Sequence, residues 1–355
     1  VYFENIGLSY ELTEQYDAAI EAYKKAVELN PENPEGWNRL GLVSYKMGLF
    51  EDAVDNYNMS VQLEPEEPVF QANLALALEL DNEPEKAYDH YKLATELDVH
   101  NSEYRHALGV VCMKIGKQDE AVVHFKKAIN LSPNKAKYYE SLGLTLEGLN
   151  RMEEAESYFV EAVRQAPEKA MFWNRLGLIS FKLRKYKEAI QYYVKATEIE
   201  PDNALFYGNL GLAFEMCKQL KQSQEAYKKA VEKNPENPEF WNSLGIVSHK
   251  MQQPEEAIDY YEKAIGLAPE KAIYYANLGL SFEGVGKLDE ALNCYERAMD
   301  LEPIQAKNWY NLILVLTLMD RYEEATEKLH LALDRFPNND LLNEAKSKID
   351  IIVNN

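Results

Sequence analysis

Residues 35–65 read EGWNRLGLVSYKMGLFEDAVDNYNMSVQLEP, and this stretch contains the pattern that organises the whole chain. Its first half places Trp37 and Gly41 four residues apart on one face of an expected α-helix. Gly48 then suits the position after a helix C-terminus, where the backbone often adopts a left-handed conformation. A second helical stripe begins at Ala53 and continues with a tyrosine four residues later, before a proline ends the stretch. The segment therefore predicts two short helices joined by a tight turn.

The same pattern returns every 34 residues along the chain. Ala75 and Ile313 fill the two gaps in the glycine column, and Leu329 ends the aromatic column. The glycine column is Gly7, Gly41, Gly109, Gly143, Gly177, Gly211, Gly245 and Gly279. The proline column is Pro31, Pro65, Pro133, Pro167, Pro201, Pro235, Pro269, Pro303 and Pro337. The aromatic column is Tyr23, Tyr57, Tyr91, Phe125, Phe159, Tyr193, Tyr227, Tyr261 and Tyr295.

These columns predict ten contiguous units in residues 1–339, with boundaries near 33, 67, 101, 135, 169, 203, 237, 271, 305 and 339. Residues 340–355 are expected to form a capping helix, because their apolar residues lie on one side only. The chain begins at Val1, inside a unit, so we expect an upstream segment in the natural protein. We expect local fraying or bending at two places where recurring residues are replaced: one at Ala75 with Val99, and the other at Ser223.

Repeated glycine inside a helix needs a reason, because each glycine costs about 1 kcal/mol relative to alanine. Close approach of a neighbouring helix supplies one, since glycine has no Cβ. We expect the Tyr57 column to fill the space beside the Gly41 column. One helix pair cannot bury such faces alone, so consecutive pairs must stack.

Composition limits the possible partners. The 355 residues carry 38 basic and 59 acidic side chains, a net charge of −21. This balance argues against nucleic acid and against an anionic membrane surface, both of which need clustered Lys and Arg. No apolar run is long enough for a transmembrane helix, so direct membrane insertion is not expected. The three cysteines cannot build a disulfide framework; they favour a cytoplasmic location without fixing one.

The combined pattern, W-x2-LG followed by A-x3-Y/F-x2-A and then P, resembles the tetratricopeptide repeat (TPR) family. It occurs as Trp37, Leu40, Gly41, Ala53, Tyr57 and Pro65, and again in the segments beginning at Trp173 and Trp241. The resemblance covers nearly the whole chain. It implies an all-α, right-handed α-solenoid superhelix of antiparallel helix pairs. It also implies that the first helix of each pair lines a concave face, where family members usually bind partners.

A doubled period of 68 residues lies over the 34-residue repeat. Tryptophan occurs only in alternate units, and a glutamate column in the other units faces a lysine column. These columns have two interpretations: an internal ladder between adjacent helices, or a charged track for a partner. The glutamates are Glu11, Glu79, Glu147, Glu215 and Glu283, and the lysines are Lys46, Lys114, Lys182 and Lys250.

Two further columns are expected on the same face. One is uniformly apolar, from Leu8 to Leu314, and could pack neighbouring helices or form a floor for an amphipathic partner. The other is rich in asparagine and is similar to the asparagine ladder of O-GlcNAc transferases. The candidate partner-binding groove is Asn73, Glu79, Lys114, Glu147, Asn174, Phe181, Lys182, Asn209, Glu215, Asn242, His249, Lys250, Asn277 and Glu283. The apolar column lacks the Asn with which chaperone-binding relatives clamp a C-terminal carboxylate, which argues against heat-shock chaperone tails.

The sequence offers no catalytic, cofactor or metal motif. Cys112, Cys217 and Cys294 have no closely spaced cysteine or histidine partner, and Cys112 falls on a buried stripe. We therefore expect a non-catalytic scaffold or adaptor that binds a peptide, a helix or a subunit. One alternative is a targeting or regulatory region of a longer enzyme, O-GlcNAc-transferase-like or other. Another is an architectural solenoid that assembles through its ends or convex face.

Overall fold

The computed structural model describes residues 2–353 and folds that range into 21 α-helices, without a strand. We call the odd-numbered helices from α1 to α19 A helices and the even-numbered helices B helices. The A helices are α1 (Tyr2–Leu12), α3 (Pro34–Lys46), α5 (Pro68–Leu80), α7 (Ser102–Lys114), α9 (Ala136–Gly148), α11 (Ala170–Lys182), α13 (Ala204–Met216), α15 (Pro238–Lys250), α17 (Ala272–Gly284) and α19 (Ala306–Leu318). The B helices are α2 (Tyr16–Leu29), α4 (Phe50–Leu63), α6 (Pro84–Leu97), α8 (Gln118–Leu131), α10 (Met152–Gln165), α12 (Tyr186–Ile199), α14 (Leu220–Lys233), α16 (Pro254–Leu267), α18 (Leu288–Leu301) and α20 (Tyr322–Arg335).

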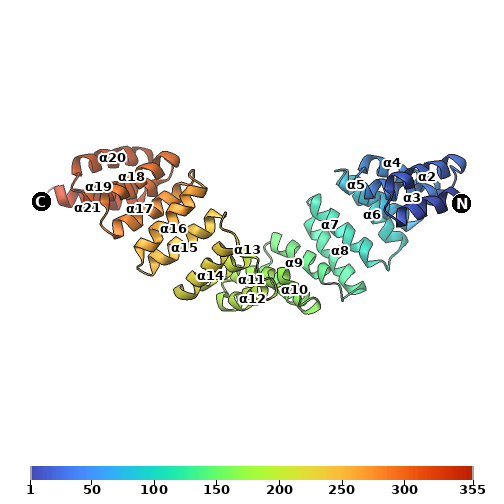
Figure 1. The fold of residues 1–355 in the computed structure, drawn as a ribbon, viewed down its shortest axis with the longest axis horizontal. Coiled ribbons are helices and arrows are strands. Elements are labelled where there is room, and N and C mark those ends of the chain that lie inside the picture. The colour runs from blue at the N-terminus through green and yellow to red at the C-terminus, as the bar shows by residue number, and fades with distance from the viewer. Residues whose placement is uncertain (1, 354–355) are drawn as a thin grey trace. The chain divides into compact units, whose positions relative to one another are not determined.

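The chain is an all-α solenoid of tandem helix pairs, as the sequence predicts. Each sequence boundary, from residue 33 to residue 339, falls in the loop before a helix. The contacts divide the chain into two compact units, Val1–Ile179 and Ser180–Asn355. Within each unit an A helix packs on its own B helix, and that B helix packs on the next A helix (Figure 1). No helix in residues 2–353 combines the length and apolar character needed to cross a membrane.

The turn between A and B helices has the same backbone conformation in every pair. One residue in each turn has a φ between 58° and 78°, and these residues recur every 34 positions. Gly48, Gly116 and Gly286 take this conformation without strain, because they lack Cβ. The other seven positions are Glu14, Asn82, Asn150, Arg184, Lys218, Gln252 and Asp320.

Aromatic rings of the B helices lie directly on the glycines of the A helices. A Cβ built on Gly41 would come within 2.7 Å of Tyr57 Cδ1. The same relation holds for Gly245 with Tyr261, at 2.6 Å from Cε1. The expected packing is therefore confirmed: the missing Cβ leaves room for the ring, and the buried ring offsets the poor helix propensity of glycine.

Each tryptophan closes the loop that precedes its own A helix. Trp37 Nε1 donates to the carbonyl oxygen of Pro31 at 2.9 Å, and Trp241 does the same to Pro235 at 2.8 Å. In α9, Tyr139 Oη makes the equivalent bond to Pro133 at 2.9 Å. The proline and aromatic columns of the sequence are thus linked by a hydrogen bond.

Helix α21 (Asp340–Val353) covers the end of the second unit. Leu342, Ala345 and Ile349 are fully or almost fully buried against α19 and α20. This confirms a one-sided final helix; residues 354–355 of the expected capping segment lie outside the described residues. Ile352, one of the apolar residues on that side of the expected capping helix, is instead 41% exposed.

Candidate functional site

The glutamate and lysine columns form ion pairs between successive A helices. Glu11 Oε1 accepts from Lys46 Nζ at 2.8 Å, although the glutamate side chain is only 7% exposed. The same pairing joins Glu79 to Lys114 at 2.8 Å and Glu215 to Lys250 at 2.7 Å. The internal ladder predicted as one of two interpretations is therefore present in these three pairs.

Glu11, one of the paired glutamates, also accepts from a tyrosine of its own helix pair. Tyr23 Oη donates to Glu11 Oε2 at 3.0 Å, so the two carboxylate oxygens have different donors. Burial, together with the neighbouring carboxylate, raises the pKa of Tyr23 well above its usual range. The phenol therefore remains a hydrogen-bond donor at physiological pH and holds the glutamate in place.

Amide groups join the A helices that the ion pairs do not. Asn73 Nδ2 donates to Asn38 Oδ1 at 2.8 Å, and Asn277 Nδ2 donates to Asn242 Oδ1 at 2.9 Å. At the equivalent place between α7 and α9, His106 Nε2 lies 2.9 Å from Ser141 Oγ. Asn73 and Asn277, two asparagines of the candidate groove, thus hydrogen-bond to asparagines of the preceding A helix.

Ion pairs and amide bonds alternate along the A helices. An ion pair joins α1 to α3, an amide bond joins α3 to α5, and an ion pair joins α5 to α7. In the second unit an ion pair joins α13 to α15, and an amide bond joins α15 to α17. The 68-residue period of the sequence is therefore the period of this alternating interface chemistry.

The other candidate groove residues also lie on A helices. Glu147 is on α9 and the buried Asn174 is on α11, both in the first unit. Phe181, Lys182 and Asn209 belong to the second unit. Phe181 packs edge-on against Tyr186, with ring centroids 5.1 Å apart. In α15, His249 Nδ1 lies 3.0 Å from Ser281 Oγ.

The ladder changes between α17 and α19. Glu283 accepts from Tyr295 Oη at 2.8 Å, but the position that carries lysine in earlier pairs holds Leu318. In the described part of the chain no lysine forms an ion pair with Glu283, and Leu318 is 55% exposed. Glu283 therefore has a free cation position beside an exposed aliphatic side chain.

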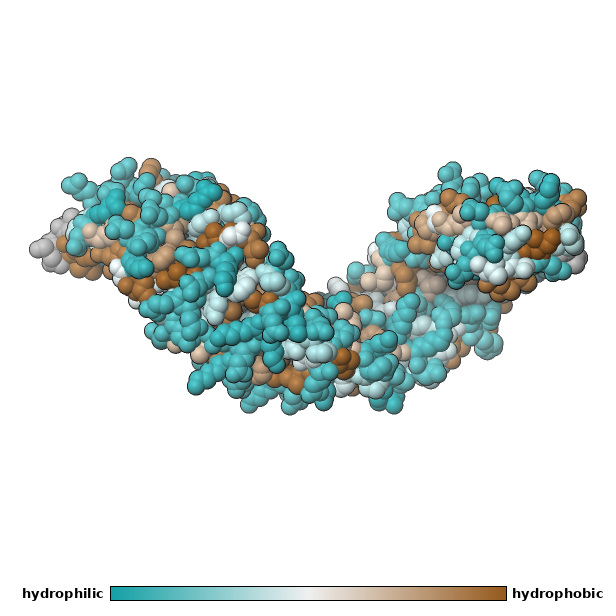
Figure 2. Space-filling model, viewed as in Figure 1, coloured by the Kyte–Doolittle hydropathy of each residue, from teal (hydrophilic) through white to brown (hydrophobic). Residues whose placement is uncertain are grey.

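Two hollows open on either side of Glu283. The larger, about 500 Å³, lies between α19 and α21 and is almost entirely apolar. The smaller, about 340 Å³, lies toward α15 and includes His249 and Leu280. Apolar residues are visible in this part of the second unit in Figure 2, in brown. The larger hollow is lined by Glu283, Leu314, Thr317, Leu318, Ala345, Lys348, Ile349, Ile351 and Ile352. We call the two hollows with Glu283 between them the Glu283 groove.

Sequence reasoning identified Glu283 and His249 but missed Leu318 and all residues of α21 in the Glu283 groove. A signal was present: the lysine column ends at Lys250, whereas the glutamate column continues to Glu283. The contribution of α21 could not be foreseen, because it depends on how that helix packs on α19.

The apolar column predicted on the same face remains partly exposed in every A helix. Leu212 is 40% exposed, and Leu8 and Leu280 are each 36% exposed. The column is therefore only partly covered by neighbouring helices, and a floor for a partner stays a prediction.

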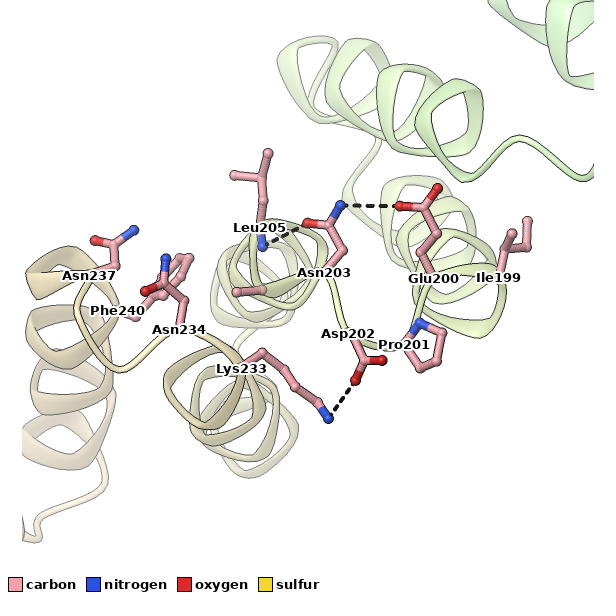
Figure 3. A pocket seen from close by; sticks show the side chains of 11 residues that line it. Ile199, Glu200, Pro201, Asp202, Asn203, Leu205, Lys233, Asn234, Asn237 and Phe240 are labelled. Carbon is pink, nitrogen blue, oxygen red and sulfur yellow. Dashed lines mark hydrogen bonds and ion pairs between the residues drawn. The ribbon is translucent and has the colours of Figure 1, made fainter.

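A third hollow, about 790 Å³, lies beside the two loops at residues 200–203 and 234–237 (Figure 3). Its polar groups bond mainly to one another. Lys233 Nζ pairs with Asp202 at 2.9 Å, and Asn203 Nδ2 donates to Glu200 at 3.3 Å. Asn203 also accepts from the backbone of Leu205, so this hollow offers few unsatisfied groups to a ligand.

Known proteins resemble the chain in repeat type and fold. A family model described as "TPR repeat" matches residues 7–48 and 109–150, which confirms the tetratricopeptide resemblance. No curated protein matches the chain. Among solved structures, YrrB, described as a TPR protein with an unusual peptide-binding site, is 25% identical, covering 53% of this chain and 97% of its own, with a TM-score of 0.47. Yeast Tom70 is 16% identical, covering 98% of this chain and 95% of its own, with a TM-score of 0.45.

One family model spans more than half of the sequence. It is described as "Cilia and flagella-associated protein 70 C-terminal domain" and matches residues 136–347. This range runs from α9 into α21 and contains Glu283 and Leu318, but it ends before the groove residues Lys348, Ile349, Ile351 and Ile352. The chain therefore belongs to the family of the cilia and flagella-associated protein 70 C-terminal domain.

Proposed function

We propose that this protein is a non-catalytic interaction scaffold that binds a basic, aliphatic segment of a partner protein in the Glu283 groove. The observation that carries the proposal is the missing lysine opposite Glu283. The three ladder glutamates described above each pair with a lysine of the next A helix. Opposite Glu283 the chain has Leu318, and the adjoining hollow is apolar.

The groove fits one class of occupant best. A lysine or arginine of the partner can take the position that Lys250 takes beside Glu215. Aliphatic side chains next to that cation can bury themselves against Leu318, Ile349 and Ile352. Lys348 of the rim already pairs with Glu344 at 2.7 Å, so it does not neutralise Glu283. An amphipathic helix or an extended peptide presents this combination of side chains.

The net charge of −21 supports a basic partner, since long-range attraction speeds the encounter of opposite charges. The matched family is named for cilia and flagella, so those organelles are the first place to seek the partner. The central residues Phe181 and Lys182 remain a second candidate location on the A helices. A regulatory region of a longer enzyme, or an architectural solenoid, would show no selective requirement for Glu283.

The test is a selection of short random peptides displayed on phage against the immobilised full chain. Enriched peptides are synthesised, and their affinities are measured by fluorescence anisotropy. We expect sequences that combine Lys or Arg with aliphatic residues. Glu283→Gln and Leu318→Lys should each weaken binding by about tenfold or more, because one removes the anion and the other fills the cation position.

A matched control is Ile304→Lys, which adds the same charge at a site that is 72% exposed and outside both hollows. It should bind the peptides as the unmodified chain does. Equal affinity for all four proteins would contradict the proposed site. Loss of binding in Phe181→Ala alone would move the site to the central helices.

A further inference from the structure

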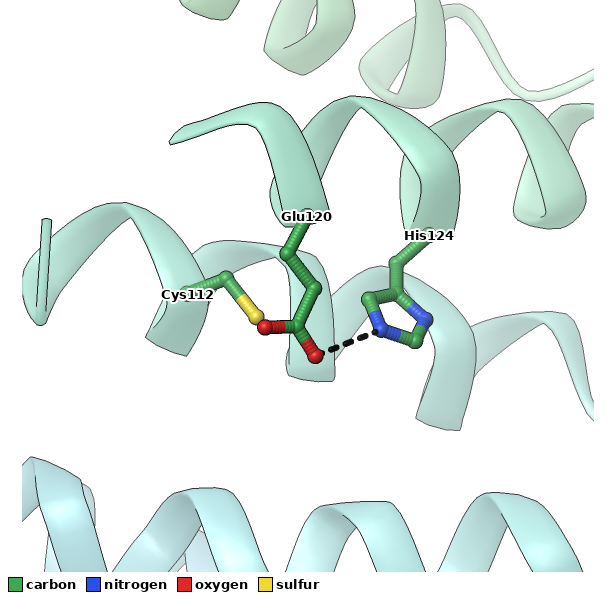
Figure 4. Close-up of side chains that lie close together, drawn as sticks. All are labelled: Cys112, Glu120 and His124. Carbon is green, nitrogen blue, oxygen red and sulfur yellow. Dashed lines mark ion pairs between the residues drawn. The ribbon is translucent and has the colours of Figure 1, made fainter. Parts of the chain in front are cut away.

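A thiol, a carboxylate and an imidazole converge between α7 and α8. Cys112 comes from α7, whereas Glu120 and His124 lie one turn apart on α8, and all three side chains point toward one another (Figure 4). The Sγ atom, a carboxylate oxygen and a ring nitrogen lie within 4.8 Å of one another. Cys112 is fully buried, while the side chains of His124 and Glu120 are 12% and 37% exposed. The trio is therefore enclosed on one side and reachable past Glu120.

The distances suit a small metal ion. His124 Nε2 lies 3.5 Å from Glu120 Oε1. Two ligand atoms about 2.0 Å from a tetrahedral Zn²⁺ lie about 3.3 Å apart, so a zinc ion could contact both with little movement. A donor set of sulfur, nitrogen and oxygen is also one that Zn²⁺ accepts, whereas Ca²⁺ and Mg²⁺ require oxygen ligands.

His124 lacks good hydrogen bonds in this environment. Its Nδ1 is buried without a hydrogen-bond partner, and the distance of its Nε2 from Glu120 is longer than that of a normal charge-assisted bond. The Nε2 that faces Glu120 and lacks a hydrogen bond of normal length is a second feature that points to a ligand.

Neighbouring side chains hold the carboxylate in position. Tyr88 Oη, from α6, donates to Glu120 Oε1 at 2.6 Å. Lys117 Nζ lies 4.0 Å from Glu120 Oε2 and 3.8 Å from the centre of the Tyr88 ring. Such outer contacts commonly orient the ligands of metal sites. Burial raises the pKa of Cys112 to about 11, so metal binding must release the thiol proton to solvent.

Only one of the ten units carries this trio. The positions equivalent to Cys112 and His124 hold Ser44 and Asn56 in the second unit of the sequence repeat, and Ser248 and Tyr260 in the eighth. The sequence predicted no metal site, because no two cysteines or histidines are closely spaced; the structure adds the packing of α7 on α8. We propose that Cys112, Glu120 and His124 form a Zn²⁺ site whose fourth position is open to water or an exchangeable ligand.

Cobalt provides the test, because a thiolate bound to Co²⁺ gives an intense charge-transfer absorption. The reduced, metal-free full chain is titrated with Co²⁺ and then with Zn²⁺. We expect the absorption to appear, to saturate at about one equivalent, and to disappear as Zn²⁺ displaces Co²⁺. Cys112→Ser should abolish the absorption, and His124→Asn should weaken Co²⁺ binding at least tenfold.

The substitutions introduce residues that the chain already has at the equivalent positions of other repeats. Serine is buried without disruption at the equivalent positions Ser44 and Ser248, so Cys112→Ser should fold, which circular dichroism checks. Cys217→Ser removes a different thiol and should leave the absorption unchanged. Absence of the absorption in the unmodified chain, or its persistence in Cys112→Ser, would overturn the proposal. Unchanged Co²⁺ affinity in His124→Asn would also overturn it.

Discussion

Lys250 Nζ lies 2.7 Å from Oε1 of Glu215, on the preceding A helix, and that glutamate side chain is only 15% exposed. The pair therefore satisfies a carboxylate that has little access to water. Replacing Lys250 with alanine should weaken the contact between α13 and α15 by about 1 kcal/mol, because a poorly hydrated charge loses its partner. Hydrogen exchange of these two helices measures the local effect.

The double variant Lys250→Ala/Glu215→Gln is the control for that prediction. A neutral glutamine needs no cation, so much of the lost protection should return. If the single variant exchanges at the rate of the unmodified chain, the ion pair contributes nothing to the interface.

The glycine column predicts opposite effects for two identical substitutions. Gly245→Ala places a methyl group 2.6 Å from Tyr261 Cε1, and displacing the ring should cost more than the gain in helix propensity, a net loss of about 1 kcal/mol. Gly266→Ala, at an exposed position of α16, meets nothing within 4 Å and should stabilise its helix by up to about 1 kcal/mol. Thermal denaturation compares the two variants. A rise in Tm for both would show that the close approach at Gly245 is unimportant.

The left-handed turn position predicts a stabilising substitution. Gln252 has a φ of 61°, a conformation in which a side chain clashes with the backbone. Gln252→Gly should relieve that strain, for a net gain of roughly 0.5 kcal/mol after the entropy cost of glycine. Gly116→Ala, at a φ of 78°, is the reverse change and should lower Tm. A destabilised Gln252→Gly protein would mean that contacts of the glutamine outweigh the backbone strain.

His106 should make stability depend on pH. Its ring stacks on Tyr138 at 4.7 Å, and burial lowers its pKa to about 4 from a usual value of 6.5. Between these values the unfolded chain binds a proton that the folded chain does not, so stability falls as pH decreases from 6.5 to about 4. The full effect of the lowered pKa is about 3 kcal/mol.

His106→Asn isolates this contribution, because asparagine occupies the equivalent positions Asn38 and Asn242 and is hydrogen-bonded there. The unmodified chain should lose more stability than the variant between pH 7 and about 4. Parallel loss in both proteins, measured by urea denaturation, would show that His106 does not carry the dependence. His90 and His124 also have pKa values lowered by burial and remain in both proteins.

Much of the fold follows from single columns of the sequence, since each recurring residue satisfies a local geometric need. Gly41 makes room for Tyr57, and Trp37 closes the loop at Pro31. The spacing of the glutamate and lysine columns also predicted that these side chains face each other, because adjacent repeats place them on neighbouring helices. Ser223, predicted as a weak point, donates a buried hydrogen bond to the Gly211 carbonyl at 2.7 Å, which the hydrophobic pattern could not reveal.

The sites were less predictable because they arise where the repeat is broken. The Glu283 groove depends on Leu318 and on the packing of α21, which has no counterpart in the repeat. The Cys112 cluster depends on side chains from two helices that are separated in sequence and unrelated to the repeated columns. The columns predict the structure that all repeats share. These two sites instead consist of residues that differ from those at the equivalent positions of other repeats.

The location of a bound peptide distinguishes the Glu283 groove from every other surface of the chain. Hydrogen–deuterium exchange of the full chain is measured with and without a saturating amount of the tightest peptide from the phage selection. We expect slower exchange in α17, α19 and α21 when the peptide is bound, and no change in that region for Leu318→Lys at the same peptide concentration. Protection confined to other helices, or to the loops near residues 199–240, would contradict the claim that the unpaired Glu283 marks the binding site.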